Sequence, residues 1–246
     1  RNSIFAGLMP SEIQEYYPEY WLNDNEKGGK NLHEEKLLSE QIRRTFRKPV
    51  KHAYYKVTTV EKGKQLVDNI QNCLTNDFTA IVYNFIDMLS HARTEMEILK
   101  ELASDEKAYR SLTRSWFSHS AIWEALKIIA EHDVQLFIGT DHGSIRVNEP
   151  SKVVGDRETT TNLRYKVGKN LQYDRNDVLD VRRPIDAKLP TPNVSSTFIF
   201  AKNSKFFLYP NNYNHYNKYY QDTFQHGGIS LEEVIIPIIK LRSRKL

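Results

Sequence analysis

Five residues in three separate parts of the sequence carry side chains that bind metal ions: Asp87, His91, Asp141, His142 and His226. The first two are four residues apart, the next two are consecutive, and the last precedes two glycines. Residues four apart on a helix project from one face, so the first pair could share one ion. The consecutive pair could share a second ion if its loop turns sharply. Carboxylate and imidazole ligands suit catalytic Zn²⁺, so the pattern predicts a split metal site.

Each of these motifs also has an ordinary structural interpretation. An isolated Asp-x-x-x-His pair is more often a hydrogen-bonded or solvated pair on a helix surface. His226, in the same way, can be a histidine in a glycine turn. The Thr-Asp-His-Gly sequence at residues 140–143 is the stronger signal, because it follows an apolar run that ends in a glycine.

Three further polar residues are candidates for substrate binding: Asn162, Arg164 and Arg93. The first two alternate within a predicted strand, so both could present donors to a phosphate from one face. Arg93 follows the first metal motif closely enough to reach a phosphate, or it could pair with Glu97, four residues further on. The tyrosine-rich stretch 209–220 could stack bases or simply pack half-buried.

These residues need a sheet to bring them together, and the apolar pattern predicts one. Helices are expected at 31–47, 59–74 and 119–132, and buried strands at 78–85 and 134–138. Helices alternating with buried strands favour an α/β fold with a mostly parallel sheet flanked by helices. Because ligands bind beyond the carboxyl ends of such strands, the first two motifs stand where a site is expected.

After Gly139 the chain becomes rich in glycine and proline, which predicts a loop-rich insertion with a strand at 197–201. Near the end, Ser230 and Glu233 form a capping-box pattern before an apolar run that contains Pro237, which suggests a helical turn and then an edge strand. No repeat or linker divides residues 1–246, so a single domain is expected.

Composition limits the classes of protein that are possible. The chain has 246 residues, a net charge of +4 and one cysteine, Cys73. This charge is compatible with a phosphate-bearing ligand but too small to imply a surface that coats nucleic acid. One cysteine excludes an internal disulfide framework, and no apolar run approaches the roughly 20 residues of a membrane span. We therefore expect a cytoplasmic protein without a membrane partner.

Several segments resemble a known family: NFIDMLSHAR at 84–93, TDHGSIR at 140–146, GDRETTTNLRYK at 155–166, and YPNNY with FQHGGIS at 209–230. They are similar to the PglZ domain of PorX-type response regulators, which belongs to the alkaline-phosphatase superfamily. The resemblance covers nearly the whole chain and implies an alkaline-phosphatase-like fold.

By this resemblance, one zinc ion is held by Asp87, His91 and His226, and the other by Asp141 and His142. The resemblance further implies an aspartate ligand and a nucleophilic threonine or serine upstream of Arg1. We therefore expect the sequence to be truncated at its start, with a receiver domain and a helical bundle absent.

The activity implied by the resemblance is that of a two-zinc phosphodiesterase acting on cyclic or linear oligonucleotides. It would be the output domain of a two-component regulator controlling type IX secretion, with a sensor kinase acting on the receiver and a possible homodimer. The alternative is a non-catalytic regulatory module that binds a nucleotide or a protein.

Overall fold

The computed structural model describes residues 1–23, 31–103 and 105–242, without the side chains of Asp87, Ser90, His91, Arg93, Glu97 and Lys100. Contacts within the chain divide it into two compact units. Unit 1 comprises residues 1–45 and 140–237, and unit 2 comprises residues 46–139 and 238–246. The prediction of one domain over residues 1–246 stays a prediction.

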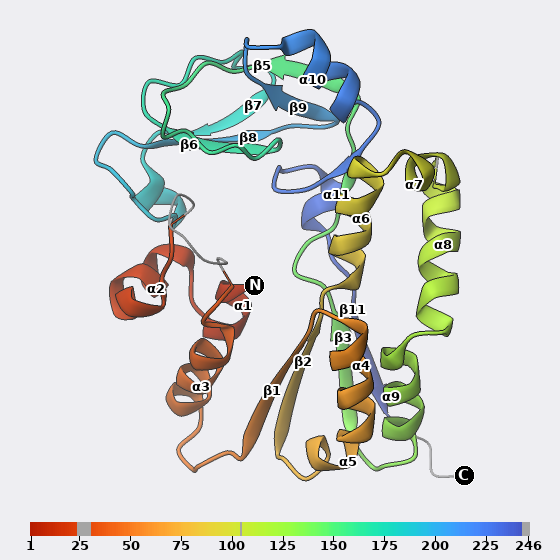
Figure 1. Ribbon diagram of the computed structural model, residues 1–246. Coiled ribbons are helices and arrows are strands. Elements are labelled where there is room, and N and C mark those ends of the chain that lie inside the picture. The colour runs from red at the N-terminus through yellow and green to blue at the C-terminus, as the bar shows by residue number, and fades with distance from the viewer. Residues whose placement is uncertain (24–30, 104, 243–246) are drawn as a thin grey trace. The chain divides into compact units, whose positions relative to one another are not determined.

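Unit 2 contains the helix-and-strand alternation expected from the sequence. Strands β1 (His52–Val57) and β2 (Phe78–Tyr83) pair in parallel, and the connection between them is formed by α4 (Val60–Asp68) and α5 (Ile70–Cys73). Helix α9 (Ala121–Ala130) packs beside α4 (Figure 1). Their shared core buries Val57, Leu66, Ile70, Cys73, Ala125 and Ile129. The helix predicted at 59–74 is therefore two helices, divided at Asn69.

The rest of unit 2 consists of three helices, the first of which contains positions 87 and 91, and of a second pair of strands. Helices α6 (Phe85–Glu95), α7 (Glu97–Leu102) and α8 (Glu106–Ser118) follow β2 in the chain. Strand β3 (Gln135–Gly139) pairs antiparallel with β11 (Ile238–Arg242), the edge strand expected from the apolar run at the end. The strand predicted at 78–85 ends early because Phe85 already begins α6.

Unit 1 begins with α1 (Asn2–Ala6), α2 (Pro10–Tyr16) and the 3-10 turn η1 (Pro18–Tyr20). Helix α3 (Glu34–Thr45) confirms the helix expected at 31–47, and its acidic first turn and basic last turn suit the helix dipole. Helices α1 and α3 pack together, and Ala6 and Leu37 form a buried core with Ile13 of α2.

The remainder of unit 1 is built from short strands (Figure 1). Strands β6 (Tyr165–Gly168), β8 (Thr197–Ala201) and β7 (Val178–Val181) form one antiparallel sheet in that order. The sheet core buries Val153, Val178, Ile199, Ala201 and Phe207. The remaining elements are β4 (Ile145–Arg146), β5 (Glu149–Lys152), η2 (Pro184–Ala187), β9 (Lys205–Leu208), α10 (Tyr213–Tyr220), β10 (Phe224–Gln225) and α11 (Leu231–Val234).

The prediction of a mostly parallel sheet was wrong. Among the described strands, the sheets are small and mixed: β1 pairs with β2 and β5 with β9 in parallel, and the other pairs are antiparallel. Parallel pairing needs a long crossover connection, which the helices between β1 and β2 provide. The strand-rich stretch after Gly139 carries no such alternation of helix and strand, and most of its strands pair antiparallel. The fold is therefore mixed α/β.

Within the described part of the chain, no helix combines the length and apolar character needed to span a bilayer.

Candidate functional site

The Asp141–His142 loop lies in unit 1 and is held by one hydrogen bond within the loop and one to α11 (Leu231–Val234). The Thr140 hydroxyl donates to the carbonyl of His142 at 2.9 Å, and the Gly143 N–H donates to the carbonyl of Glu233 at 2.9 Å. A Cβ at Gly143 would stand 1.9 Å from the carbonyl oxygen of Glu232. Only glycine permits this approach, so the glycine after the Asp-His pair docks the loop against α11.

His142 and His226 lie face to face, although they are far apart in the sequence. Their ring centroids are 3.9 Å apart, with an angle of 16° between the ring planes. Nδ1 of His142 lies 3.0 Å from the carbonyl oxygen of Gly143, so we assign the proton to Nδ1. Nε2 then keeps a lone pair, and it lies 3.8 Å from Oδ2 of Asp141. A nitrogen free to bind a metal ion thus lies beside a carboxylate.

Asp141 also faces a positive charge from the start of the chain. Nε of Arg1 lies 3.7 Å from Oδ2 of Asp141 and 2.8 Å from Oε1 of Glu34. Glu34 is only 1% exposed at the start of α3, so Arg1 compensates a buried carboxylate as well. No sequence motif pointed to this ion pair, because its residues are distant in the chain and individually unremarkable.

Arg164 does not face solvent as a phosphate-binding residue would. Its side chain is 0% exposed and forms a two-pronged ion pair with Glu233, with Nε–Oε1 at 3.0 Å and Nη2–Oε2 at 2.6 Å. It also donates to the carbonyls of Ala201 and Lys205. The expectation that it shares a strand face with Asn162 was wrong, because both residues precede β6 in an irregular segment. Every contact of this guanidinium is internal to unit 1.

Glu233 is the second buried member of that pair. Burial acts to raise the pKa of its carboxyl, but the hydrogen bonds and charge of Arg164, with donors from Gly228 and Ser230, outweigh this and lower it. Both Ser230 N–H and Oγ–H donate to Oε2, so the predicted capping box is confirmed. The sequence pattern found Glu233 as a helix cap, but it gave no sign of the ion pair with Arg164.

Asn162 lies beside the loop that carries His226. Its Oδ1 accepts hydrogen bonds from the N–H groups of Arg164 and Tyr165, at 2.7 and 3.2 Å. A Cβ on Gly227 would be 3.4 Å from the same oxygen, and Gly227 has a φ of +109° that disfavours other residues. Asn162 therefore shapes a turn next to the predicted ligand, and its predicted role in substrate binding stays a prediction.

The side chains of Asp87, His91 and Arg93 lie outside the described residues. Helix α6 spans all three positions, as the predicted sharing of an ion by the first pair requires. Their predicted roles as metal ligands and substrate contact stay predictions.

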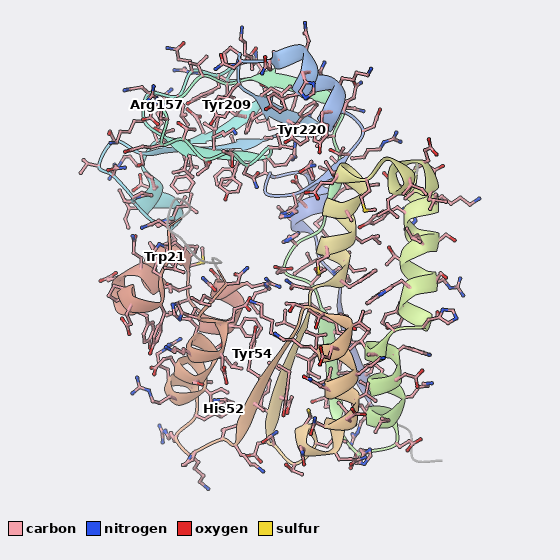
Figure 2. The ribbon with its side chains drawn as sticks, in the orientation of Figure 1. Trp21, His52, Tyr54, Arg157, Tyr209 and Tyr220 are labelled. Atoms are coloured by element: carbon pink, nitrogen blue, oxygen red, sulfur yellow. The ribbon has the colours of Figure 1, made fainter. Side chains whose placement is uncertain are left out.

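A buried lysine in unit 1 was not anticipated from the sequence. Lys166 on β6 is 1% exposed, and burial lowers the pKa of its ammonium to about 8. Its Nζ lies 4.3 Å from the centre of the Tyr209 ring, and the Tyr209 hydroxyl donates to the carbonyl of Thr160. Figure 2 labels Tyr209 and Tyr220, two tyrosines of the stretch 209–220. Tyr220 packs on the core around Phe206, as the half-buried interpretation expects.

The donors in unit 1 fit Zn²⁺ by their chemistry, since one carboxylate and two imidazoles are ligands that catalytic zinc sites use. They occur as neighbouring pairs: Asp141 with His142, and His142 with His226. Among the side chains that the structure describes, no three histidines, cysteines or carboxylates form a group that could hold a metal ion.

The chain was compared with protein families and with curated proteins. The PglZ family model, described as the BREX system PglZ alkaline phosphatase-like domain, matches residues 1–241. No curated protein matches the chain.

Proposed function

Because the chain belongs to the PglZ family of alkaline-phosphatase-like domains, we propose that it is a zinc-dependent hydrolase of phosphate esters. The observation that carries the proposal is the His142–His226 ring pair, which has the Asp141 carboxylate at its edge. Asp141 and His142 in one loop and His226 in another bring zinc-ligand side chains from two distant parts of the sequence together, which a purely structural turn does not require.

The residues of unit 1 would serve this chemistry in distinct ways. The hydrogen bond at Nδ1 of His142 fixes the tautomer and aims Nε2 at the site. Asp141 would contribute a carboxylate oxygen, which Arg1 now faces. By the sequence resemblance, His226 would bind the other of the two ions together with Asp87 and His91, while Asp141 and His142 bind the first. Bound Zn²⁺ would supply Lewis-acid polarisation of a phosphoryl oxygen.

Arg1 would hold Asp141 in place until the ion binds. Its guanidinium lies within ion-pair distance of both Asp141 and the buried Glu34. A bound cation would neutralise the charge of Asp141, and Arg1 would then pair with Glu34 alone. Arg1 would then be a cation available to an anionic substrate.

The finer proposal concerns the substrate and the biological setting, and it rests on the sequence resemblance. We propose a phosphodiesterase of cyclic or linear oligonucleotides, with Asn162 as a contact to substrate. The setting would be a PorX-type response regulator in type IX secretion, with a sensor kinase as partner and a homodimer as the active form.

The test is zinc content and turnover, measured on the full-length polypeptide. The protein, stripped with chelator and dialysed against Zn²⁺, should hold two ions by elemental analysis and hydrolyse bis(4-nitrophenyl) phosphate. His142→Ala and His226→Ala should each lower zinc content and turnover. His215→Ala is the matched control, because His215 lies on α10 and stacks on Tyr219 instead.

The results separate the two functions. Zinc bound without turnover would favour the regulatory binding module over the enzyme. Unchanged zinc content in both the His142 and His226 variants would refute the proposed site.

A further inference from the structure

One residue, Glu233, is bonded to both of the loops that carry the predicted histidine ligands. Its backbone carbonyl accepts the N–H of Gly143, at 2.9 Å, one residue after His142. Its carboxylate accepts the N–H of Gly228, at 2.8 Å, two residues after His226. The two loops are otherwise far apart in the sequence, so Glu233 joins them through two short hydrogen bonds.

Arg164 fixes the direction of that carboxylate. A guanidinium presents its donors in a rigid planar fork, and here Nε and Nη2 bind both oxygens of Glu233, at 3.0 and 2.6 Å. The same guanidinium donates to the carbonyl of Ala201, in β8, and to that of Lys205, in β9. Arg164 thus fixes the orientation of the Glu233 carboxylate relative to β8 and β9.

The loop after His226 is shaped to fit this pair. A Cβ at Gly228 would stand 2.6 Å from Nη2 of Arg164 and 2.7 Å from the carbonyl oxygen of Ala201. The absence of a side chain at Gly228 therefore lets the loop backbone reach the ion pair. The second glycine after the histidine is explained by this close approach.

Stability alone is a weak reason for such a pair. Removing two charges from water costs several kcal/mol per ion, and a buried ion pair is often no more stabilising than apolar residues of the same volume. Capping is a weak reason as well, because α11 has only 4 residues and the bond from the Ser230 N–H engages only Oε2 of Glu233. What a fully bonded, directional pair does provide is a fixed geometry for the groups attached to it.

We infer that the buried Arg164–Glu233 pair is a positioning device that holds the His142 and His226 loops in register, so that the two imidazoles meet as a preformed ligand pair. This inference rests on the proposed function for its metal-binding consequence. Neither residue touches the metal or the substrate in this role.

The test compares Arg164→Lys with wild type and with Arg182→Lys. Lysine keeps the charge but lacks the fork, so Arg164→Lys should bind Zn²⁺ about tenfold more weakly in calorimetric titrations of the metal-free protein. The visible spectrum of the Co²⁺-substituted protein should also change, because it reports ligand geometry. Arg182→Lys is the matched control, because Arg182 is exposed and its Nε lies 3.0 Å from Oδ2 of Asp180. This variant should bind Zn²⁺ as the wild type does.

A folded Arg164→Lys protein with wild-type zinc affinity and an unchanged Co²⁺ spectrum would overturn the inference. Glu233→Gln provides a second variant if the first does not fold. Lower thermal stability with unchanged affinity would mean that the pair is merely structural, and this too would overturn it.

A measurement without metal or substitution separates failure of the inference from failure of the proposed function. In wild-type protein, amide hydrogen exchange at Gly143 and Gly228 should occur through one shared opening, with protection factors that agree within about threefold. If the wild type binds no Zn²⁺, the proposed function fails, but joint protection would still support the positioning role. Protection factors that differ tenfold or more would overturn the inference whatever the zinc result.

Discussion

Replacing Lys166 with methionine should stabilise the protein near neutral pH, and the gain should shrink as the pH rises. Lys166 is 1% exposed, and burial lowers the pKa of its ammonium from an ordinary 10.5 to about 8. Methionine fills a similar volume without a charge. The substitution therefore removes the desolvation of a cation while leaving the packing on β6 nearly intact.

The sign and size follow from proton linkage. A base whose pKa falls on folding opposes folding while it stays charged: fully below a pH of about 8, and less and less up to about 10.5. A fall of about 2.5 in pKa, at about 1.36 kcal/mol per unit, corresponds to about 3 kcal/mol. The gain for the variant is therefore up to about 3 kcal/mol below a pH of about 8.

The assay is urea unfolding followed by circular dichroism, at pH values from about 7 to about 10. Lys169→Met is the matched control, because Lys169 is 37% exposed and its ion pair with Glu158 spans 3.8 Å. That control should change the free energy of unfolding little at any pH. The reasoning is refuted if Lys166→Met is less stable than wild type near pH 7, or if its advantage does not fall with rising pH.

Four further outcomes are expected. Gly143→Ala should destabilise the protein by about 1 to 3 kcal/mol in urea unfolding, since its Cβ would meet a carbonyl oxygen at 1.9 Å; wild-type stability would contradict the loop geometry. Leu66→Ala, at a site 3% exposed, should cost about 2 to 5 kcal/mol and reduce amide protection in unit 2. Ser120→Ala removes the side-chain acceptor of the Trp123 N–H and should cost about 1 kcal/mol. Glu233, whose pKa is lowered, stabilises the fold above its ordinary 4.5, and this contribution is lost as the pH falls through the lowered value; Glu233→Gln should therefore flatten the acid limb of the stability profile, measured by urea unfolding.

Much of unit 2 could be predicted from the sequence because its signals are local. Apolar residues at helical spacing marked α9, and short, largely apolar runs marked β2 and β3. Strand direction was not predictable in this way. Pairing is decided by contacts between distant segments, and the alternation of helix and strand that gave parallel β1 and β2 does not continue past Gly139.

At the candidate site, the sequence likewise predicted the types of residue but not where every side chain lies. Residue types and chain order selected Asp141, His142 and His226, and the structure brings the two imidazoles together. The same reasoning placed Arg164 on one strand face with Asn162, because alternating residues on a strand share a face. The error has a physical cause: Arg164 precedes β6, where alternation does not apply, and Glu233 stabilises its charge in the interior.

The capping box at residues 230–233 predicts only one of the interactions that Glu233 makes in the structure. The pattern predicts that Glu233 bonds the Ser230 N–H, and it does so at 3.1 Å. A cap on a surface helix, however, would leave the rest of the carboxylate to water. Here Glu233 is 3% exposed, so its remaining lone pairs must find protein donors, and they find Arg164 and the Gly228 N–H. A cap alone contributes about 1 kcal/mol. Because it is buried, Glu233 also connects the loop of His142 to the loop of His226. The buried carboxylate of Glu233 is therefore better explained by its bonds to Arg164 and Gly228 than by the capping of α11, a helix of four residues.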